Sequence, residues 1–283
     1  MTMNLILQGP APDPASMQGI AAMARARTIV ELNPRTWRCE QAEDDPALRL
    51  AVLRACFDAG IDGNYMRAGR RLSDFGLLAM DMDSTLITIE CIDEIADMQG
   101  LKPQVARITE AAMRGEIAFA ESLVQRVALL RGLDHGALQQ VYEQRLRFSP
   151  GATVLIERAR KAGLKTLLVS GGFTYFTERV KQQLGLDFAH ANVLEIEHGK
   201  LTGRVVGDIV DAAGKRRMVE STCAALGIAS SGAIVIGDGA NDLEMMSIAG
   251  LSVAYRAKPI VRAQAGAALN FNGLDGILSL FDE

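Results

Sequence analysis

The chain has 283 residues, of which 49% are hydrophobic and 23% charged, and its net charge is −4 at pH 7. This composition is typical of a globular protein with a packed core, and it excludes the disordered and collagen-like classes. No apolar run approaches the ~18 residues of a membrane helix, and the first residues lack the basic segment of a signal peptide. Because the sequence also has no long basic stripe, we expect a cytoplasmic protein that binds neither nucleic acid nor membranes.

Residues 1–72 predict a small α+β domain. Leu5–Leu7 and Thr28–Leu32 are short apolar or β-branched runs, which are typical of strands. Ser16–Ala26 and Pro46–Ala59 have helical periodicity. This βαβα order favours a ferredoxin-like or ACT-like module.

A doubly wound α/β core is predicted over residues 73–89 and 149–283. Apolar runs at Phe75–Met80, Lys165–Val169 and Ala233–Ile236 each end in a polar or glycine-rich turn, and helical stretches follow them or lie between them. Continuous apolar strands that alternate with helices indicate a buried parallel sheet. Such sheets bind ligands at the carboxyl ends of their strands, where all three turns are expected.

Two segments interrupt this core. Residues 90–148 have helical periodicity and no strand-like run, so we predict a helical cap above the strand ends. Val193–Glu197 and Lys200–Val206 flank His198-Gly199, a pattern typical of a β-hairpin. The sequence leaves open whether this hairpin is a flap over the site or a surface ribbon.

Asp81 and Asp83 follow the first core strand, two residues apart. If the chain leaves the strand there, both carboxylates reach one small site. One can then attack or hold a cation, while the other carries a proton for a leaving group. Ser84 and Thr85 add hydroxyl and backbone N–H groups for an anion. Taken alone, the same residues also fit an Asx-turn that begins a helix.

Asp238 and Asp242 follow the third core strand and favour a metal site. Two like charges ~4 Å apart repel by about 1 kcal/mol even in water, so a cluster of carboxylates either raises its pKa values or binds a hard cation. Oxygen ligands favour Mg²⁺, whereas zinc prefers His or Cys, which this pattern lacks.

Lys215 supplies a positive charge near a predicted helix start and is a candidate phosphate ligand. Ser170, Gly171 and Gly172 follow the second core strand and offer a hydroxyl and unhindered backbone N–H groups to the same phosphate. For Lys215 alone, a solvated surface lysine remains an alternative.

These motifs, in this order, resemble those of the haloacid dehalogenase superfamily: Asp81-Met82-Asp83-Ser84-Thr85, Ser170-Gly171-Gly172, Lys215, and Gly237-Asp238-Gly239-Ala240-Asn241-Asp242. Within that superfamily, three segments are similar to the phosphoserine phosphatases: residues 81–97, 112–116 and 170–173. The resemblance covers about residues 75 to 270. It implies the superfamily's α/β core, a magnesium cofactor, and hydrolysis of O-phosphoserine through an aspartyl-phosphate intermediate.

The resemblance also implies roles for core residues. Asp81 is the nucleophile and Asp83 the general acid and base. Magnesium is expected on the Asp81 carboxylate, the Asp83 main-chain oxygen and Asp238, with Asp242 nearby. Ser170 and Lys215 would hold the phosphate, and Asn241 would contact it or orient Lys215.

In the cap, the resemblance implies that Glu90 meets the substrate ammonium and Arg126 its carboxylate. Met113 and Phe119 would close over the site. Two other interpretations stay open: Arg126 extends into solvent from the edge of an apolar stripe, or Glu90 only complements a helix dipole.

Other functions also stay open at this stage. One is a related phosphatase or phosphotransferase that acts on another small alcohol such as homoserine. Another is an N-terminal unit that senses an amino acid. The sequence leaves the oligomeric state open, a homodimer included.

Overall fold

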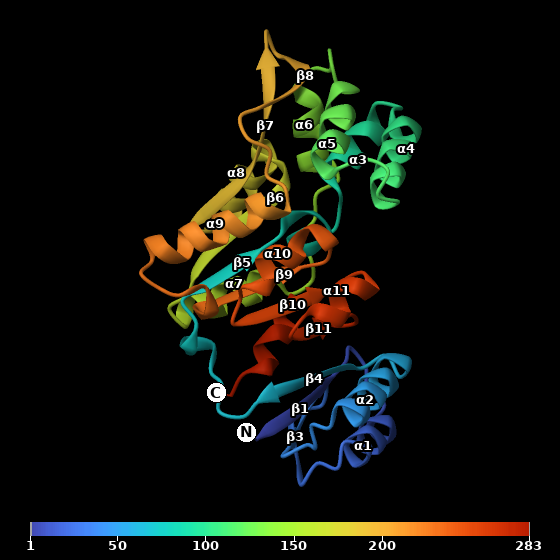
Figure 1. Cartoon of the computed structure of the whole chain (residues 1–283), viewed down its shortest axis with the longest axis vertical. Helices are drawn as coiled ribbons and strands as arrows, with labels where there is room; N and C mark the ends of the chain where they lie inside the picture. Colours follow the sequence, from blue (N-terminus) through green and yellow to red (C-terminus); the bar gives the residue numbers. More distant parts are fainter. Residues whose placement is uncertain (1, 283) are drawn as a thin grey trace.

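The computed structural model of the chain describes residues 2–282, apart from the side chain of Met113. Within these residues the strands form two sheets, one of four strands and one of seven. Figure 1 shows three tiers along the long axis: the N-terminal unit at the bottom, the larger sheet with its helices in the middle, and a helical layer at the top. The predicted α/β class, with a small α+β unit and an inserted helical cap, is confirmed.

The larger sheet has the strand order β11-β10-β9-β5-β6-β7-β8. Neighbouring strands are parallel except β7 and β8, which pair antiparallel. The strands are β5 (Leu77–Met80), β6 (Lys165–Phe173), β7 (Phe188–Glu197), β8 (Lys200–Val206), β9 (Ala233–Gly237), β10 (Leu251–Tyr255) and β11 (Ala267–Leu269). The predicted strands correspond to β5, β6 and β9, which lie side by side at the centre of the sheet.

Helices cover both faces of this sheet, because alternate residues of a strand point to opposite sides. Leu77 and Ala79 of β5 share a buried cluster with residues of α9, α10 and α11. Leu78 and Met80 share another with residues of α7 and α8. These helices are α7 (Ala152–Lys161), α8 (Thr174–Leu184), α9 (Ala212–Ala225), α10 (Leu243–Ser247) and α11 (Pro259–Gln264). The carboxyl ends of β5, β6 and β9 therefore meet at one edge, below the helical layer.

The helical layer, or cap, is inserted between β5 and α7 (Figure 1). It contains α3 (Cys91–Met98), α4 (Lys102–Met113), α5 (Phe119–Ala128) and α6 (Gly136–Gln144). Leu201 of β8 accepts a hydrogen bond from Gly132 N and donates one to Leu133 O, each 2.8 Å long, so the β7–β8 hairpin supports the cap. At its tip, His198 and Gly199 have φ of 50° and 77°, as a two-residue hairpin turn requires. Among the described residues, no helix has the length and hydropathy needed to span a bilayer.

The N-terminal unit has the order β-α-β-β-α-β, and its sheet has the all-antiparallel strand order β2-β3-β1-β4, which is the ferredoxin-like arrangement. Its elements are β1 (Met3–Gln8), α1 (Pro14–Met23), β2 (Thr28–Asn33), β3 (Thr36–Glu40), α2 (Pro46–Asp58) and β4 (Asp62–Arg67). The predicted βαβα order lacked β3 and β4. β4 begins Asp62-Gly63-Asn64, three residues that strands disfavour. The domain boundaries near residues 72, 90 and 148 stay predictions.

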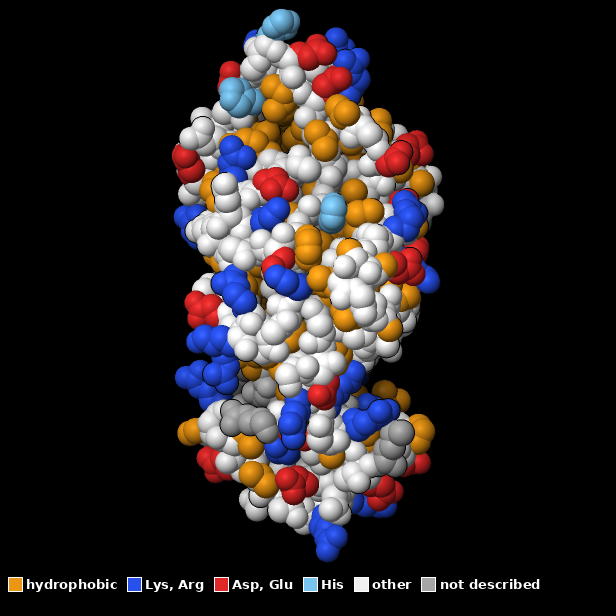
Figure 2. Space-filling model, turned by 90° about the vertical axis from the view of Figure 1, so that its left-hand side faces the viewer, with side chains coloured by type: hydrophobic (Ala, Val, Ile, Leu, Met, Phe, Trp, Pro, Cys, Tyr) orange, Lys and Arg blue, Asp and Glu red, His pale blue; other side chains and the backbone are white. Residues whose placement is uncertain are grey.

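This unit docks on the edge of β11 through buried polar side chains of β4, and the molecule narrows at the junction (Figure 2). Asn64 Nδ2 donates to Ala268 O at 3.0 Å, and Ala268 N donates to Asn64 Oδ1 at 2.7 Å. Asp62, 1% exposed, accepts hydrogen bonds from the backbone N–H groups of residues 270–272. These side chains take the place of a neighbouring strand at an otherwise open sheet edge.

Replacing Asp62 by alanine is expected to lower the free energy of unfolding by at least about 1–3 kcal/mol, because buried N–H donors lose their acceptor. The matched control is Asp58→Ala, which removes an exposed pair with Arg54 and should change stability by less than about 1 kcal/mol. Chemical denaturation of both variants tests this. Equal effects of the two substitutions would show that Asp62 does not anchor the junction.

Candidate active site

The turn after β5 places Asp81 and Asp83 at the strand end. Asp81 N donates to Ile236 O at 3.0 Å, which continues the pairing with β9 by one residue. The chain then turns sharply through Met82–Leu86, where Ser84 has a left-handed φ of 57°. Asp81 makes no side-chain capping bond to this turn, so it does not form the alternative Asx-turn. Its carboxylate points instead to the other strand ends.

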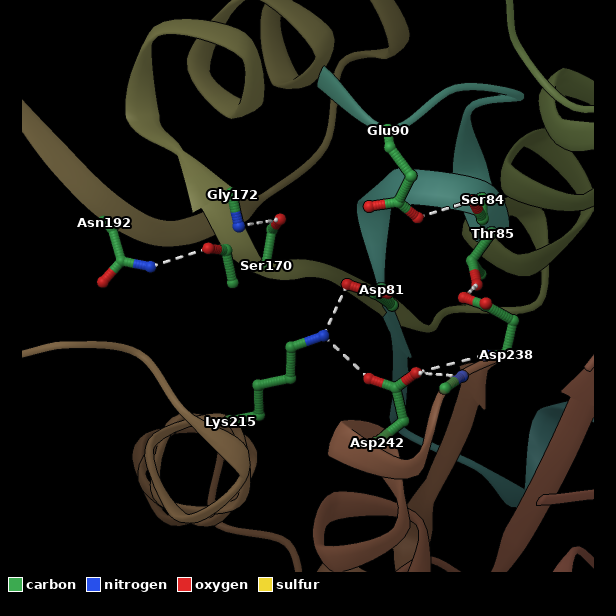
Figure 3. Close-up of polar contacts among 12 residues, drawn as sticks. Asp81, Ser84, Thr85, Glu90, Ser170, Gly172, Asn192, Lys215, Asp238 and Asp242 are labelled. Carbon is green, nitrogen blue, oxygen red and sulfur yellow. Dashed lines mark hydrogen bonds and ion pairs between the residues drawn. The ribbon is translucent and has the colours of Figure 1, made fainter. Parts of the chain in front are cut away.

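Lys215 lies at the centre of the site. Its Nζ donates to Asp81 Oδ1 at 2.6 Å and to Asp242 Oδ1 at 2.7 Å (Figure 3). The side chain is 1% exposed, so the alternative of a solvated surface lysine is wrong. Burial by itself lowers the pKa of Lys215, but the carboxylates of Asp242 and Asp81 raise it above its usual value. The ammonium therefore stays charged and holds two strand ends together.

Asp81, Asp238 and Asp242 form an acidic cluster, with one carboxylate oxygen of each within 4.8 Å of the others. Asp242 is fully buried, and its second oxygen accepts from the N–H groups of Asp238 and Gly239, so it supports the cluster from behind. Asp238 accepts from Thr85 Oγ1 at 2.9 Å. Burial and then Asp242 raise the pKa of Asp81 well above its usual value and that of Asp238 to about 6.

This cluster fits a hard divalent cation. Its donors are carboxylate oxygens, which Mg²⁺ prefers. Burial and then the repulsion by Asp242 raise the pKa values of Asp81 and Asp238, and a bound cation would offset both effects. The Asp83 carboxylate is not part of the cluster, because its Oδ1 accepts from Cys91 N at 3.2 Å, at the start of the cap. Of the predicted ligand side chains, the structure therefore brings together three.

Asp83 faces the second strand end. A Cβ on Gly172 would lie 2.7 Å from Asp83 Oδ2, so only glycine allows this approach. Burial is the main cause that raises the pKa of Asp83 to about 6, while its bonds to Cys91 lower it. The carboxyl group is therefore able to carry a proton near neutral pH.

Ser170, Gly171 and Gly172 were predicted as a turn after the strand, but β6 continues through them to Phe173. The pairing of β6 with β7 is irregular here, between Val169 and Phe173. Gly172 N donates to Ser170 Oγ at 2.8 Å. A Cβ on Gly171 would lie 2.9 Å from Cζ of Phe119, so this cap residue reaches the core.

Glu90 and Arg126 enter the site from the cap side. Glu90 Oε1 accepts from Ser84 Oγ at 2.7 Å (Figure 3). Part of the Glu90 side chain is accessible to solvent, but protein atoms surround its carboxylate and limit its hydration. This burial, and then the negative charge of Asp83, raise the pKa of Glu90 to about 7. Burial lowers the pKa of Arg126, and the negative charges of Asp93 and Glu90 offset part of this decrease. Arg126 is half-buried, and its Nε donates to Ser122 O at 3.4 Å.

For two predicted site residues, Met113 and Asn241, the described part of the structure shows no contact that tests the expected role. Met113 ends α4, but its side chain lies outside the described residues. Asn241 lies in the short turn Ala240–Asp242, and among the described residues no hydrogen bond joins it to Lys215. Asn192 was not among the predicted site residues. It is a buried amide that bonds Gly171 O and lies beside Ser170 and Gly172 (Figure 3). An asparagine inside an otherwise strand-like segment was the available signal.

Comparison with known proteins decides the family. Residues 78–247, more than half of the chain, match the family described as haloacid dehalogenase-like hydrolase. The chain belongs to this family. Residues 5–52 match a domain of unknown function. The resemblance inferred from the motifs is thereby confirmed.

Within this family, similar proteins are named phosphoserine phosphatases. One from Albidiferax ferrireducens is 59% identical over 75% of this chain and 91% of its own length. One from Polaromonas sp. is 57% identical over 78% of this chain and 96% of its own length.

Solved structures share the whole architecture. A HAD family hydrolase from Salmonella enterica serovar Typhi has a TM-score of 0.90 at 29% identity and covers 100% of this chain and 99% of its own. A probable phosphoserine phosphatase from Vibrio cholerae has a TM-score of 0.83 at 35% identity and covers 98% of this chain and 86% of its own.

Proposed function

We propose that the protein is a phosphoserine phosphatase that hydrolyses O-phosphoserine to serine and phosphate with Mg²⁺ as cofactor. The observation that carries this proposal is the buried Lys215 that joins Asp81 to Asp242 beneath a cap bearing Glu90 and Arg126. The similarity to named phosphoserine phosphatases over most of the chain supports the choice of substrate.

The reaction has two steps. An ionised Asp81 oxygen forms a bond to phosphorus, and the bond from phosphorus to the serine oxygen breaks. Asp83 donates a proton to that serine oxygen as it leaves. Asp83 then takes a proton from a water molecule, whose oxygen attacks phosphorus and releases phosphate from Asp81.

The other core residues bind and orient the phosphate. Lys215 and Ser170 hold its oxygens, and Asn241 contacts them or orients Lys215. The cation would be held by Asp81, Asp238 and the main-chain oxygen of Asp83, with Asp242 behind them. When bound, Mg²⁺ neutralises negative charge on the transferring group. Positioning and charge neutralisation therefore account for most of the rate.

Substrate choice falls to the cap, because the core contacts only phosphate. Glu90 binds the ammonium group and Arg126 the carboxylate of an amino acid. Phe119, which already reaches Gly171, covers the phosphate with Met113 and excludes water while the leaving group departs.

A phosphate-release screen tests the proposal. The purified protein is assayed with phosphoserine, phosphothreonine, sugar phosphates and nucleotides, with Mg²⁺ and with a chelator. We expect preference for phosphoserine and loss of turnover with the chelator. A preference for sugar phosphates would overturn the substrate assignment. Transfer of phosphate to an added alcohol such as homoserine would instead favour a phosphotransferase.

Replacing Arg126 by methionine is expected to lower kcat/KM for phosphoserine about 10- to 100-fold, the effect of losing a hydrogen bond to a charged group. Phosphoethanolamine, which lacks the carboxylate, should be affected much less. The surface variant Arg107→Met is the control and should leave both values unchanged. An equal loss with both substrates in Arg126→Met would show that Arg126 does not read the carboxylate.

The pH profile of kcat/KM reports the pKa values of groups in the free enzyme. We expect its acid limb near pH 7, because the pKa of Glu90 is raised to about 7. Below its pKa of about 7, Glu90 becomes neutral and loses its attraction for the substrate ammonium, so activity falls as the pH falls. Burial raises the pKa of Glu90 most, Asp83 and Asp93 raise it further, and Ser84 and Arg126 lower it.

Glu90→Gln should remove the contribution of Glu90 to this limb. The contributions of Asp81 and Asp238, whose pKa values are also raised, and of the substrate phosphate, whose second pKa is about 6, should remain. An unchanged profile in Glu90→Gln would contradict the assignment.

A further inference from the structure

The side-chain amide of Asn192 joins two backbone segments at the site. Figure 3 shows it beside Ser170 and Gly172. The residue lies in β7 and is 1% exposed. Its Nδ2 donates to Gly171 O at 2.8 Å, and its Oδ1 accepts from Val210 N at 2.8 Å. Gly171 follows Ser170 directly, and Val210 lies two residues before α9, which carries Lys215. One buried amide therefore connects the segments that supply two proposed phosphate ligands.

The irregular pairing of β6 and β7 explains why an amide is needed here. Val169 pairs with His190 and Phe173 pairs with Asn192, so three residues of β6 lie opposite one of β7. Such a bulge leaves backbone groups without a partner in the neighbouring strand. The Asn192 side chain supplies a donor to the Gly171 carbonyl in place of a strand N–H.

The peptide group between Gly171 and Gly172 is consequently held at both ends. Asn192 Nδ2 donates to the Gly171 carbonyl oxygen, and Gly172 N donates to Ser170 Oγ at 2.8 Å. Because Ser170 Oγ accepts this hydrogen bond, its own proton is available to donate to another oxygen. If the peptide group rotated, the Ser170 hydroxyl would lose this donor and its orientation.

We propose that Asn192 is a positioning residue for phosphate binding. It fixes the Gly171–Gly172 peptide group so that the Ser170 hydroxyl donates to a phosphate oxygen, and it keeps the segment leading to Lys215 beside it. Asn192 itself touches no substrate atom and acts through the backbone. The choice of substrate rests on the proposed function, whereas the phosphate-binding test below does not.

The first test compares Asn192→Ala with Asn64→Ala. Asn64 is the matched control, because it is also buried and also bridges a backbone N–H and a backbone carbonyl, but at the N-terminal junction. We expect both variants to lose stability. Only Asn192→Ala should lower kcat/KM for phosphoserine, by about 10- to 100-fold, as loss of an orienting partner does elsewhere. Binding of inorganic phosphate, measured by calorimetry, should weaken in Asn192→Ala and stay unchanged in Asn64→Ala.

The second test asks whether Asn192 acts through Ser170. In a Ser170→Ala background, Asn192→Ala should lower kcat/KM by a smaller factor than it does in the unsubstituted protein, because the hydroxyl it positions is absent. A full additive loss would overturn the proposed route. Unchanged kcat/KM and phosphate affinity in folded Asn192→Ala would overturn the proposal itself.

If Asn192→Ala does not fold, Asn192→Asp replaces it in both tests. This variant keeps the acceptor for Val210 N but loses the donor to Gly171, and the same losses are expected. If the unsubstituted protein does not hydrolyse phosphoserine, the proposed function fails, and the phosphate-binding comparison still decides the role of Asn192.

Discussion

Replacing Asp81 by asparagine is expected to lower kcat for phosphoserine by at least about 10⁴-fold, because the reaction loses its nucleophile. Asparagine keeps an acceptor for the Lys215 ammonium, which bonds Asp81 Oδ1 at 2.6 Å, so the geometry of the site should persist. What disappears is the anionic oxygen that bonds to phosphorus. Phosphate release under saturating substrate measures the effect.

A matched Lys–Asp pair provides the control. Lys165 Nζ lies 2.8 Å from Asp187 Oδ1 at the opposite end of β6, far from the strand ends that form the site. Asp187→Asn should leave kcat unchanged. Because burial and Asp242 raise the pKa of Asp81, its ionised form destabilises the fold at neutral pH, so Asp81→Asn should not lower the free energy of unfolding. A folded Asp81→Asn variant with substantial turnover would show that the nucleophile is another residue.

Replacing Lys215 by methionine is expected to lower both activity and stability. Two buried carboxylates, those of Asp81 and Asp242, lose the cation between them, and breaking a buried pair in this way costs about 3–5 kcal/mol. The transferring phosphate also loses a charged donor, so kcat/KM should fall by at least about 10²-fold. Chemical denaturation and steady-state kinetics measure the two effects.

The control and a rescue separate these effects. Lys165→Met removes the partly exposed pair with Asp187 and should cost no more than about 1 kcal/mol. Adding Asp81→Asn to Lys215→Met removes one of the unpaired charges, so stability should partly recover while activity stays lost. If Lys215→Met were as stable as Lys165→Met, the buried ion pairs would not hold the strand ends together.

The central strands and the carboxylates at their ends were predictable from the sequence, because buried parallel strands are continuous apolar runs and the polar turns follow them directly. Asp81 and Asp238 could be placed at one edge of the sheet without coordinates. The cap was predictable only as a set of helices. Its contact with the core, from Phe119 to Gly171, depends on tertiary packing that periodicity does not contain.

The polar strand β4 shows why other elements were missed. Asp62 and Asn64 are unfavourable in strands, and they lie there because they bond to the backbone of residues 268–272 on the larger sheet. Asn192 is a similar case, since its role arises from a bulge in a neighbouring strand. In β4 and at Asn192 alike, a backbone group that is distant in the sequence determines which side chain is needed. The local sequence does not reveal that backbone group.

The most direct test of the account is to find where the phosphoryl group is held. The protein is mixed with radiolabelled phosphoserine and Mg²⁺, quenched in acid within one turnover, and digested for peptide mapping. We expect a hydroxylamine-sensitive label on the peptide that contains Asp81, and none in Asp81→Asn. Label on another residue, or turnover without any labelled protein, would contradict attack by Asp81.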